Sequence, residues 1–249
     1  MKKPFSRVGG KSKLSKTIVN LFPDNYENMV YIEPFFGGDS IYFEKKPSIK
    51  EIINDRDEDV YILMKGFKKY YGEDISNKLN KMKLSGDNFK RILHYNPNNE
   101  KEKFIKNLYL IKNSFFGMGK SFNPSGRNKA EYSNIKFNDM YKDRLKNTTI
   151  LNKDYKIVLK KYDSSNSLFY LDPPYESSDK LYKHFNIDYI EMNKILEKLK
   201  GRFLLSINYN TDFIKLFKNF KYKVLETKYA DPSNGGIVRL KKEFLFYNF

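Results

Sequence analysis

The sequence predicts an α/β fold built on an open, mostly parallel sheet, with a helical insertion in the middle of the chain. Short apolar runs alternate with amphipathic stretches near both ends of the 249 residues, as strands and helices do in such sheets. Residues 73–145 contain helix-like stretches and no convincing core strand. With 40% hydrophobic residues, the chain is long enough for one large domain, or for one domain that carries an insertion.

The first part of the chain predicts alternating helices and strands. The helical spacing of the apolar residues in 11–22 predicts a helix. Residues 30–35 are a short apolar run that ends in proline and two glycines, so they predict a buried strand that stops abruptly. A helix is expected to begin within 40–46, followed by a strand at 50–55 and a helix over 57–71.

The last part of the chain repeats this alternation. Residues 148–152 and 167–172 predict strands, and the strongly amphipathic stretch 187–200 predicts a helix. A strand at 202–208, a helix at 211–220 and two closing strands at 222–229 and 238–249 follow. The link between the closing strands is short, so we expect them to be antiparallel. Ligands of such sheets bind beyond the carboxyl ends of the parallel strands.

The middle of the chain predicts helices at 75–84 and 102–113, followed by a basic segment rich in Gly, Asn and Ser at 115–132. Such a loop is a place for contacts with a nucleic acid, although a plain solvated surface loop explains it equally well.

The composition is strongly basic, with 47 Lys and Arg against 30 Asp and Glu, a net charge of +17. This surplus favours a polyanionic partner, which means DNA, RNA or an anionic membrane, although an AT-rich coding sequence also supplies lysine. The absence of cysteine excludes disulfides, thiolate metal sites and cysteine nucleophiles. No apolar run approaches the roughly 20 residues that span a bilayer, so we expect an intracellular protein, cytoplasmic, or in the host cytoplasm if the source is a virus.

Residues 172–175 (DPPY) directly follow the apolar run SLFYL and form the most informative motif. An acid, two φ-locked prolines and an aromatic at a strand end make a rigid polar and aromatic corner. A carboxylate and a backbone carbonyl there can accept the two N–H bonds of an exocyclic amine on a planar base, while the aromatic ring stacks on the base. The alternative is a proline-rich turn with a capping Asp172.

Three further motifs lie where strands should end or where the chain begins. Residues 33–40 (EPFFGGDS) bring backbone N–H groups close to a small ligand, although many strand–helix turns carry two glycines. Asp55 ends the second strand, where an acid can bind a ribose diol or simply cap the next helix. Gly9-Gly10-Lys11 can hold a carboxylate, lacks the spacing of a P-loop, and is otherwise a flexible turn.

In this order the four motifs resemble the Dam-like (D12 class) N6-adenine-specific DNA methyltransferases over nearly the whole chain. The resemblance implies a Rossmann-like S-adenosyl-L-methionine-dependent methyltransferase sheet with a helical target-recognition insertion. It divides the chain into a catalytic, cofactor-binding part, 1–60 and 148–249, and a DNA-binding insertion, 61–147. It implies duplex DNA as partner, a restriction endonuclease as a candidate partner, and no metal.

The resemblance also assigns roles to residues. Lys11 faces the methionyl end of the cofactor, Asp55 its ribose hydroxyls, and Asp154 with Tyr155 its adenine. Asp172 contacts the target amine, with the Pro173 carbonyl as second acceptor. The implied cofactor-binding residues are Arg7, Lys11, Phe35, Gly37, Asp55, Asp154, Tyr155 and Asp172. The implied catalytic residues are Asp172, Pro173, Pro174 and Tyr175.

The chain departs from the family pattern at three places. Arg7 stands where the family has Trp, and Asp39 stands where it has a third glycine. The recognition stretch matches loosely and is shortened, so the target sequence is not readable. Candidates for contact with bases or phosphates, each of which is equally consistent with a solvated surface, are Lys112, Asn113, Lys120, Asn123 and Arg127.

The leading hypothesis is therefore transfer of a methyl group from S-adenosyl-L-methionine to the N6 amine of an adenine flipped out of duplex DNA. One alternative keeps the fold and changes the acceptor to RNA or to cytosine N4. The other alternative is a catalytically inactive relative that binds nucleic acid and in which Arg7 and Asp39 mark a decayed cofactor pocket.

Overall fold

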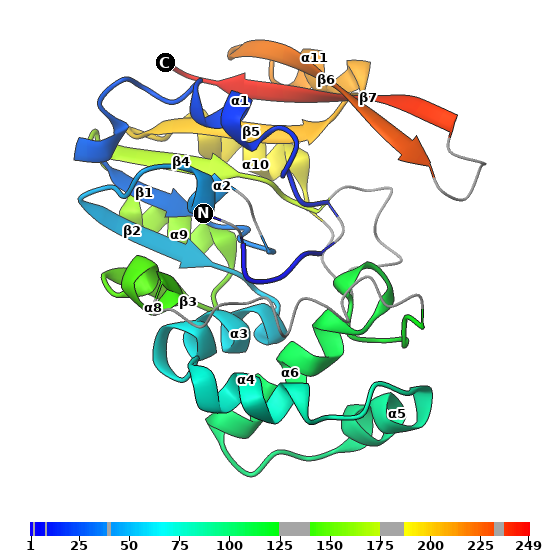
Figure 1. Cartoon of the computed structure of the whole chain (residues 1–249). Coiled ribbons are helices and arrows are strands. Elements are labelled where there is room, and N and C mark those ends of the chain that lie inside the picture. Colours follow the sequence, from blue (N-terminus) through cyan, green and yellow to red (C-terminus); the bar gives the residue numbers. More distant parts are fainter. Residues whose placement is uncertain (2, 8, 39–40, 125–139, 175–186, 232–236) are drawn as a thin grey trace.

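A seven-stranded sheet forms the centre of the protein, in the order β3-β2-β1-β4-β5-β7-β6 (Figure 1). The computed structural model describes residues 1, 3–7, 9–38, 41–124, 140–174, 187–231 and 237–249. Neighbouring strands from β3 to β5 are parallel, and β7 lies antiparallel between β5 and β6. The predicted α/β class, with its mostly parallel sheet and its antiparallel closing pair, is confirmed.

The strand bounds set the edge at which ligands can bind. The strands are β1 (Val30–Glu33), β2 (Lys50–Asn54), β3 (Thr148–Leu151), β4 (Ser167–Leu171), β5 (Arg202–Asn208), β6 (Lys221–Asp231) and β7 (Ile237–Tyr247). The chain runs outward from β1 to β2 and β3 on one side, and from β4 to β5 on the other. The order therefore reverses between β1 and β4, and a crevice for ligands is expected at such a switch point.

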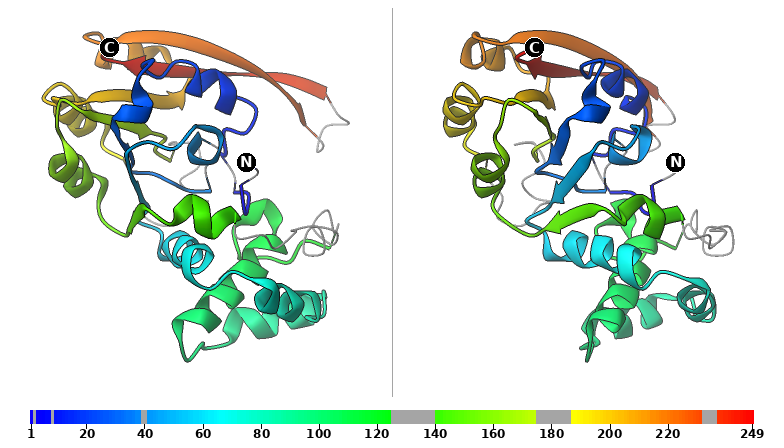
Figure 2. Two further views of the ribbon diagram at one scale, coloured as in Figure 1. Left: turned by 60° about the vertical axis from the view of Figure 1, so that its left-hand side comes forward. Right: turned by 90° about the vertical axis from the view of Figure 1, so that its left-hand side faces the viewer.

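Burial on both faces explains why the central strands are almost continuously apolar. All five residues of β4 are buried, and four of the five residues of β2 are buried. The views in Figure 2 show the sheet between two layers of helices. A parallel sheet with both faces covered has no room for the polar alternation of a half-exposed strand.

One face of the sheet is covered by helices from the second half of the chain. These are α9 (Tyr155–Tyr162), α10 (Tyr189–Leu196) and α11 (Thr211–Leu216). They share a buried cluster with alternate residues of the strands, such as Ile32 of β1 and Phe169 of β4. Each of the three helices begins at a side chain that accepts a hydrogen bond from a backbone N–H in its first turn: Asp154, Asp188 and Asn210.

The remaining helices of the described residues share a core with the other face, and some of them pack on other helices rather than on the sheet. They are α1 (Ser15–Val19), α2 (Ile41–Glu44), α3 (Glu58–Lys69), α4 (Glu73–Asn80), α5 (Gly86–His94), α6 (Glu100–Lys112) and α8 (Met140–Leu145), with short 3-10 helices η1 (Tyr26–Asn28) and η2 (Phe115–Gly117). Their buried residues form one continuous cluster with Tyr31, Tyr170 and Leu204 of the sheet. The helices α3 to α6 lie below the sheet in Figure 1 and are therefore fixed to the sheet by a shared core.

Several helices are shorter than the sequence predicts. The helix expected over 187–200 ends at Leu196: Lys198 and Leu199 donate to carbonyls three residues earlier, and the N–H groups of Lys200 and Gly201 donate to the Asp163 carboxylate at 3.0 and 2.9 Å. The helices expected at 11–22 and 211–220 cover only Ser15–Val19 and Thr211–Leu216. A helix that the sequence analysis missed, α5, begins at Ser85, whose hydroxyl accepts from the Asn88 N–H at 3.2 Å.

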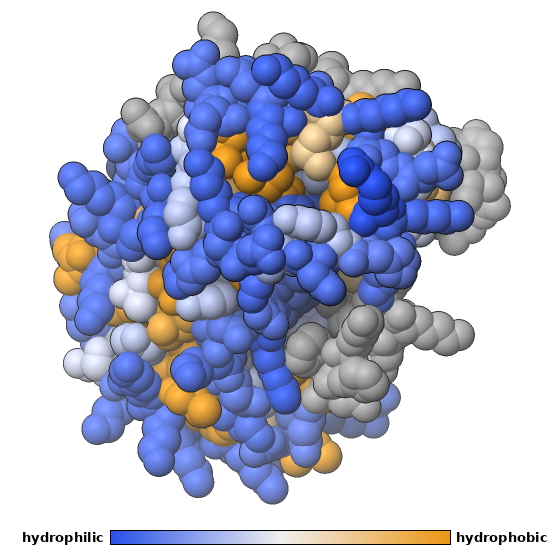
Figure 3. All heavy atoms as spheres, turned by 90° about the horizontal axis from the view of Figure 1, so that it is seen from below, coloured by the Kyte–Doolittle hydropathy of each residue, from blue (hydrophilic) through white to orange (hydrophobic). Residues whose placement is uncertain are grey.

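One face of the molecule illustrates the hydrophilic character of its surface. Seen from below, it is mostly hydrophilic, with hydrophobic residues scattered in small groups (Figure 3). Among the helices of the described ranges, none combines the length and apolar character needed to cross a membrane.

The packing of α3 on α6 gives the first testable prediction. A Cβ added at Gly66 would lie 2.1 Å from Cδ2 of the fully buried Phe104 ring. We expect Gly66→Ala to reduce the free energy of unfolding by about 1–3 kcal/mol, because the buried ring must move. Urea unfolding measures the loss. Gly86→Ala is the matched control, since its Cβ would meet Phe122 at an ordinary 3.8 Å; equal losses in both variants would contradict the packing argument.

Candidate active site

The carboxyl ends of the parallel strands bring four polar loops to one edge of the sheet. Residues 34–38 follow β1, residues 55–57 follow β2, residues 152–154 follow β3, and residues 172–174 follow β4. These segments carry most of the residues that the sequence analysis assigned to cofactor binding and catalysis. The parallel register ends the strands at the same edge, so loops that are far apart in the chain begin side by side.

Asn54, the last residue of β2, joins the loops after β1 and β3. Its Nδ2 donates to the carbonyl oxygens of Pro34 and Lys153, at 2.9 and 3.0 Å, and its Oδ1 accepts from the Lys153 N–H at 2.9 Å. The Asn54 side chain is 1% exposed, so these bonds satisfy backbone groups that water does not reach. The sequence analysis assigned no role to Asn54; the signal that could have found it is an amide side chain directly after an apolar strand run.

Asp55 lies beside the glycine turn after β1, as its predicted role requires. Its carboxylate accepts from the N–H of Gly37 at 2.6 Å and from the N–H of Asp57 at 2.8 Å. Burial is the largest influence and raises the pKa of Asp55 to about 6; the backbone N–H bonds from Asp57 and Gly37 oppose this rise, whereas the negative charge of Asp57 adds to it. The folded protein therefore binds this proton more tightly than the unfolded chain. The stabilisation that this group provides is complete below about pH 4 and is lost as the pH rises through 6.

Two aromatic rings, one after β1 and one after β3, pack against each other. The centroids of Phe35, after β1, and Tyr155, at the start of α9, are 5.0 Å apart with an interplanar angle of 36°. Asp154 accepts from the N–H of Lys156 at 2.9 Å and lies 3.6 Å from the Arg56 guanidinium. The structure thus brings Phe35 and Tyr155 together, whereas the carboxylate of Asp154 caps its helix.

Asp172 lies at the mouth of β4 and forms a buried ion pair with Lys11. The Lys11 Nζ donates to both carboxylate oxygens, at 2.7 and 2.9 Å, across 161 residues of sequence. The side chains are 1% and 13% exposed. Pro173 is buried, and the Pro174 carbonyl accepts from the Tyr189 hydroxyl at 3.3 Å, which ties the turn to α10. Tyr175 lies outside the described residues.

Arg7 has a specific partner in place of the aromatic contact of the family pattern. Its guanidinium donates to Asp57 Oδ2 at 2.8 Å, and the Arg7 side chain is 7% exposed. Asp57 in turn donates its N–H to Asp55 and accepts from the N–H of Asp59 as the cap of α3. The Arg7 guanidinium therefore contacts the loop that carries Asp55. Asp39, the other departure, lies outside the described residues.

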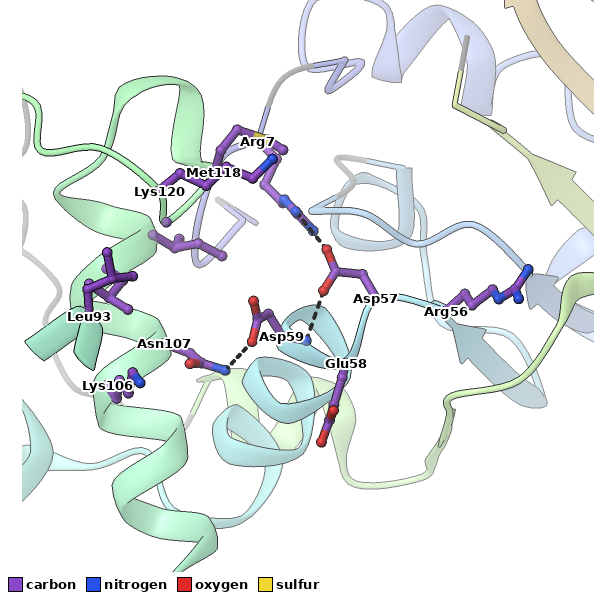
Figure 4. Close-up of a pocket in the computed structure, with 13 residues that line it drawn as sticks. Arg7, Arg56, Asp57, Glu58, Asp59, Leu93, Lys106, Asn107, Met118 and Lys120 are labelled. Carbon is purple, nitrogen blue, oxygen red and sulfur yellow. Dashed lines mark hydrogen bonds and ion pairs between the residues drawn. The ribbon is translucent and has the colours of Figure 1, made fainter. Parts of the chain in front are cut away.

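A cavity of about 390 Å³ opens beside this pair, between the start of α3, α6 and the loop after η2 (Figure 4). In Figure 4, Arg7 points to Asp57, and Asn107 of α6 donates to Asp59 at 2.9 Å. Charged residues of both signs and apolar residues line the cavity: Arg7, Arg56, Asp57, Glu58, Asp59, Leu93, Lys106, Asn107, Leu110, Ile111, Met118, Gly119 and Lys120.

The predicted DNA-contact residues divide into buried and exposed ones. Lys112 and Asn113 are only 7% and 6% exposed, and Asn113 Nδ2 donates to the Tyr109 carbonyl at 2.7 Å. Neither side chain therefore lies on an open surface, because both end α6 inside the helical packing. Lys120 is exposed and Asn123 is partly exposed, whereas Arg127 lies outside the described residues.

The loop that carries Lys120 packs on the N-terminal segment. Gly117 has φ +66°, and a Cβ there would lie 1.9 Å from the Ser6 carbonyl oxygen. Only a glycine allows this approach of two backbones. The loop is therefore held next to Arg7 and the cavity.

The Asn54 contacts give a stability prediction. Asn54→Ala leaves buried backbone groups of two loops without their hydrogen bonds, so we expect it to reduce the free energy of unfolding by about 2–4 kcal/mol. Asn152→Ala is the control, because Asn152 also bridges two carbonyls, those of Asp55 and Arg56, but is only half-buried; we expect about 1 kcal/mol. Urea unfolding at one pH compares them. A loss for Asn54→Ala no greater than for Asn152→Ala would show that the bridge is not needed.

Comparisons with known proteins agree with this arrangement. The chain is 28% identical to the type II methyltransferase M.MjaIII of Methanocaldococcus jannaschii over 267 residues, covering 91% of each chain. It is 25% identical to the type II methyltransferase M.CviBI of Paramecium bursaria Chlorella virus NC1A over 241 residues, covering 92% of each. Among solved structures, a methyltransferase from Streptococcus mutans in complex with SAH shares 14% identity at a TM-score of 0.34, over 100% of this chain and 99% of that one.

The similarity to this solved structure is too low to support a fold assignment. The assignment is based on the strand order of the sheet. The family comparison is much stronger, because the family model described as D12 class N6 adenine-specific DNA methyltransferase matches residues 8–230. That span includes the glycine-lysine, glycine-rich, Asp55 and Asp172 segments. The chain belongs to the D12 class of N6 adenine-specific DNA methyltransferases.

Proposed function

We propose that this DNA methyltransferase transfers a methyl group to the N6 amine of an adenine that is flipped out of duplex DNA. The observation that carries the proposal is the position of Asp172: a partly buried carboxylate at the mouth of β4, held by Lys11 at the switch point of the sheet. Adenine is the base that the family description names. A base inside the duplex cannot reach such a recessed carboxylate, which supports flipping.

The cofactor of this family is S-adenosyl-L-methionine, and the residues at the strand ends fit it. Gly37 has φ +58°, and among the described atoms a Cβ built there would meet none within 4 Å, so space is open beside its backbone. Asp55, next to that space, would bind the ribose hydroxyls. Phe35 and Tyr155 would flank the adenine, and Lys11 would face the methionyl carboxylate. When bound, the cofactor supplies the methyl group.

The carboxylate of Asp172 would act on the target amine. The lone pair of an exocyclic amine is delocalised into the base, so the nitrogen is a weak nucleophile. The amine would donate one hydrogen bond to the Asp172 carboxylate and a second to the Pro173 carbonyl. Both hydrogen bonds favour a pyramidal nitrogen, whose lone pair is then available to attack the methyl group. The contribution of the protein is position and electrostatics, and the fixed turn at Pro174 limits movement of the acceptors.

Contacts with DNA are proposed for the loop after η2 and the cavity beside it. The net charge of +17 supports a polyanionic substrate, and Lys120 and Lys106 contribute cations at the cavity. We retain Lys120 and Asn123 as candidate contacts, and Arg127 by its place in the sequence. Lys112 and Asn113 would reach DNA only if the end of α6 rearranged.

The division into a catalytic part, 1–60 and 148–249, and a recognition insertion, 61–147, remains part of the proposal. It is supported by the helices α3 to α6, which the chain inserts between β2 and β3. A restriction endonuclease partner is supported by the two relatives named type II methyltransferases.

The proposal is tested by Asp172→Ala and Asp172→Asn. Cells that lack N6-methyladenine express each protein, and mass spectrometry of their DNA quantifies N6-methyladenine and N4-methylcytosine. We expect N6-methyladenine with the unchanged chain and a reduction of the purified enzyme's rate by about 10²-fold or more in both variants. Asp24→Asn, an exposed acid before β1 at the opposite edge of the sheet, is the control. N4-methylcytosine, methylation of RNA in preference to DNA, or full activity in both variants would each reject the proposal.

The raised pKa of Asp55 predicts a pH dependence of cofactor binding. Asp55 must be ionised to accept hydrogen bonds from both ribose hydroxyls, and with a pKa of about 6 it protonates as the pH falls. We expect the affinity for S-adenosyl-L-homocysteine to fall about fourfold from pH 7.5 to 5.5. Isothermal titration measures it. Asp55→Asn should bind more weakly with no such pH dependence; the same pH dependence in that variant would assign it to another group.

A further inference from the structure

Glu243 is a buried acid near the catalytic carboxylate that the sequence analysis did not single out. It lies on β7, opposite Asn208 at the carboxyl end of β5, and its side chain is 1% exposed. Its neighbours Phe244 and Phe246 pack in the cluster beneath α9 to α11, and Leu245 packs in the cluster on the face of α1. Because side chains alternate along a strand, Glu243 shares the face of Leu245, which is the face on which Lys11 precedes α1.

The carboxylate of Glu243 lies between two lysines. Its Oε2 is 3.6 Å from the Lys11 Nζ and 3.4 Å from the Ser206 hydroxyl, which donates to it. Its Oε1 is 3.3 Å from the Nζ of Lys241, whose side chain is 41% exposed. Lys11 at the same time donates to both oxygens of Asp172. The buried ammonium of Lys11 thus stands between two carboxylates from different strands.

The two carboxylates differ in what they can do. Asp172 is at the open mouth of β4, where the target amine would arrive, whereas Glu243 lies inside the sheet and is held by Ser206. An ammonium bound to one carboxylate alone neutralises it and weakens it as an acceptor. A second anion near the ammonium shares its positive charge, so the first carboxylate stays a better acceptor. This interaction is strong because the dielectric constant of a buried site is low.

We propose that Glu243 is a positioning residue, which shares the Lys11 ammonium with Asp172 and so preserves the negative charge with which Asp172 accepts the target amine. Glu243 contacts neither substrate nor cofactor in this account and acts through Lys11. The proposal rests on the proposed function for the role of Asp172, but the charge coupling between Glu243 and Lys11 does not depend on it.

The coupling is tested in the protein without ligands. Glu243→Gln keeps the shape of the side chain and its contact with Ser206 but removes the charge. With ¹⁵N-lysine labelling, NMR follows the titration of the Lys11 Nζ, assigned by Lys11→Arg. We expect the pKa of Lys11 to fall by about one unit, because a nearby anion is lost. Lys241→Met leaves Glu243 without that cation and should raise the pKa of Lys11; this variant tests the coupling independently if Glu243→Gln does not fold.

Catalysis provides the second measurement. We expect the single-turnover rate of Glu243→Gln at saturating DNA and donor to fall about tenfold, while the affinity for S-adenosyl-L-homocysteine changes less than threefold. Glu226→Gln is the matched control: Glu226 pairs with Lys242 at 2.9 Å on the same hairpin, and both side chains are about half exposed. We expect wild-type values from it.

An unchanged pKa of Lys11 in both Glu243→Gln and Lys241→Met would overturn the coupling. A shifted pKa with an unchanged single-turnover rate would overturn the positioning role, as would a loss confined to cofactor affinity. If the unchanged chain methylates no adenine, the proposed function fails, and the NMR titration still decides whether Glu243 controls the charge of Lys11.

Discussion

The parallel register of β3, β2, β1, β4 and β5 is the constraint on which the site depends. It ends the strands at one edge, so the loops that follow them meet although the chain separates them widely. Register alone does not fix the loops. The buried Asn54 side chain holds the loops in place, because it ends β2 and forms hydrogen bonds with backbone groups of the loops after β1 and β3. The position of Asp55 beside Gly37 follows from this arrangement.

Buried charged side chains form clusters at two places in the described structure, and the two clusters differ in their surroundings. At one, Lys45, Glu51 and Arg144 form a network that ties α8 to β2 and α2, and Arg144 also stacks over the Tyr42 ring at 3.7 Å. Burial lowers the pKa of Lys45 to about 8; the Glu51 carboxylate partly compensates through its charge and its hydrogen bond, whereas the charge of Arg144 lowers the pKa further. This cluster lies away from the strand mouths and joins the end of the inserted helices to the sheet.

At the other place, Lys11 meets Asp172 and Glu243 at the carboxyl edge. Removing charges from water costs free energy that good geometry and further hydrogen bonds must offset. A protein that needed only stability there could place apolar side chains in the same volume. Under the proposed function, a partly buried carboxylate at the strand mouth serves the chemistry, because it would accept hydrogen bonds from the neutral target amine.

Local patterns in the sequence were sufficient for much of the fold. Apolar runs of four to seven residues predicted the central strands, because a strand buried on both faces has no polar alternation. The short link predicted the antiparallel closing pair. Helix ends were predicted less well: α10 gives way to a tighter turn after Leu196, and the N–H of Lys200 then donates to the carboxylate of Asp163, 37 residues away. A contact between residues so far apart in the chain cannot be recognised from the local sequence.

The sequence by itself determined the fold class and the order of the motifs at the strand ends, and its resemblance to a family supplied their roles. The tertiary structure alone decided which side chains meet. It paired Arg7 with Asp57, buried Lys112 and Asn113, and placed Glu243 behind Lys11. The physical reason is that propensity and apolar spacing act between near neighbours in the chain, whereas an ion pair across 161 residues exists only after the sheet has formed.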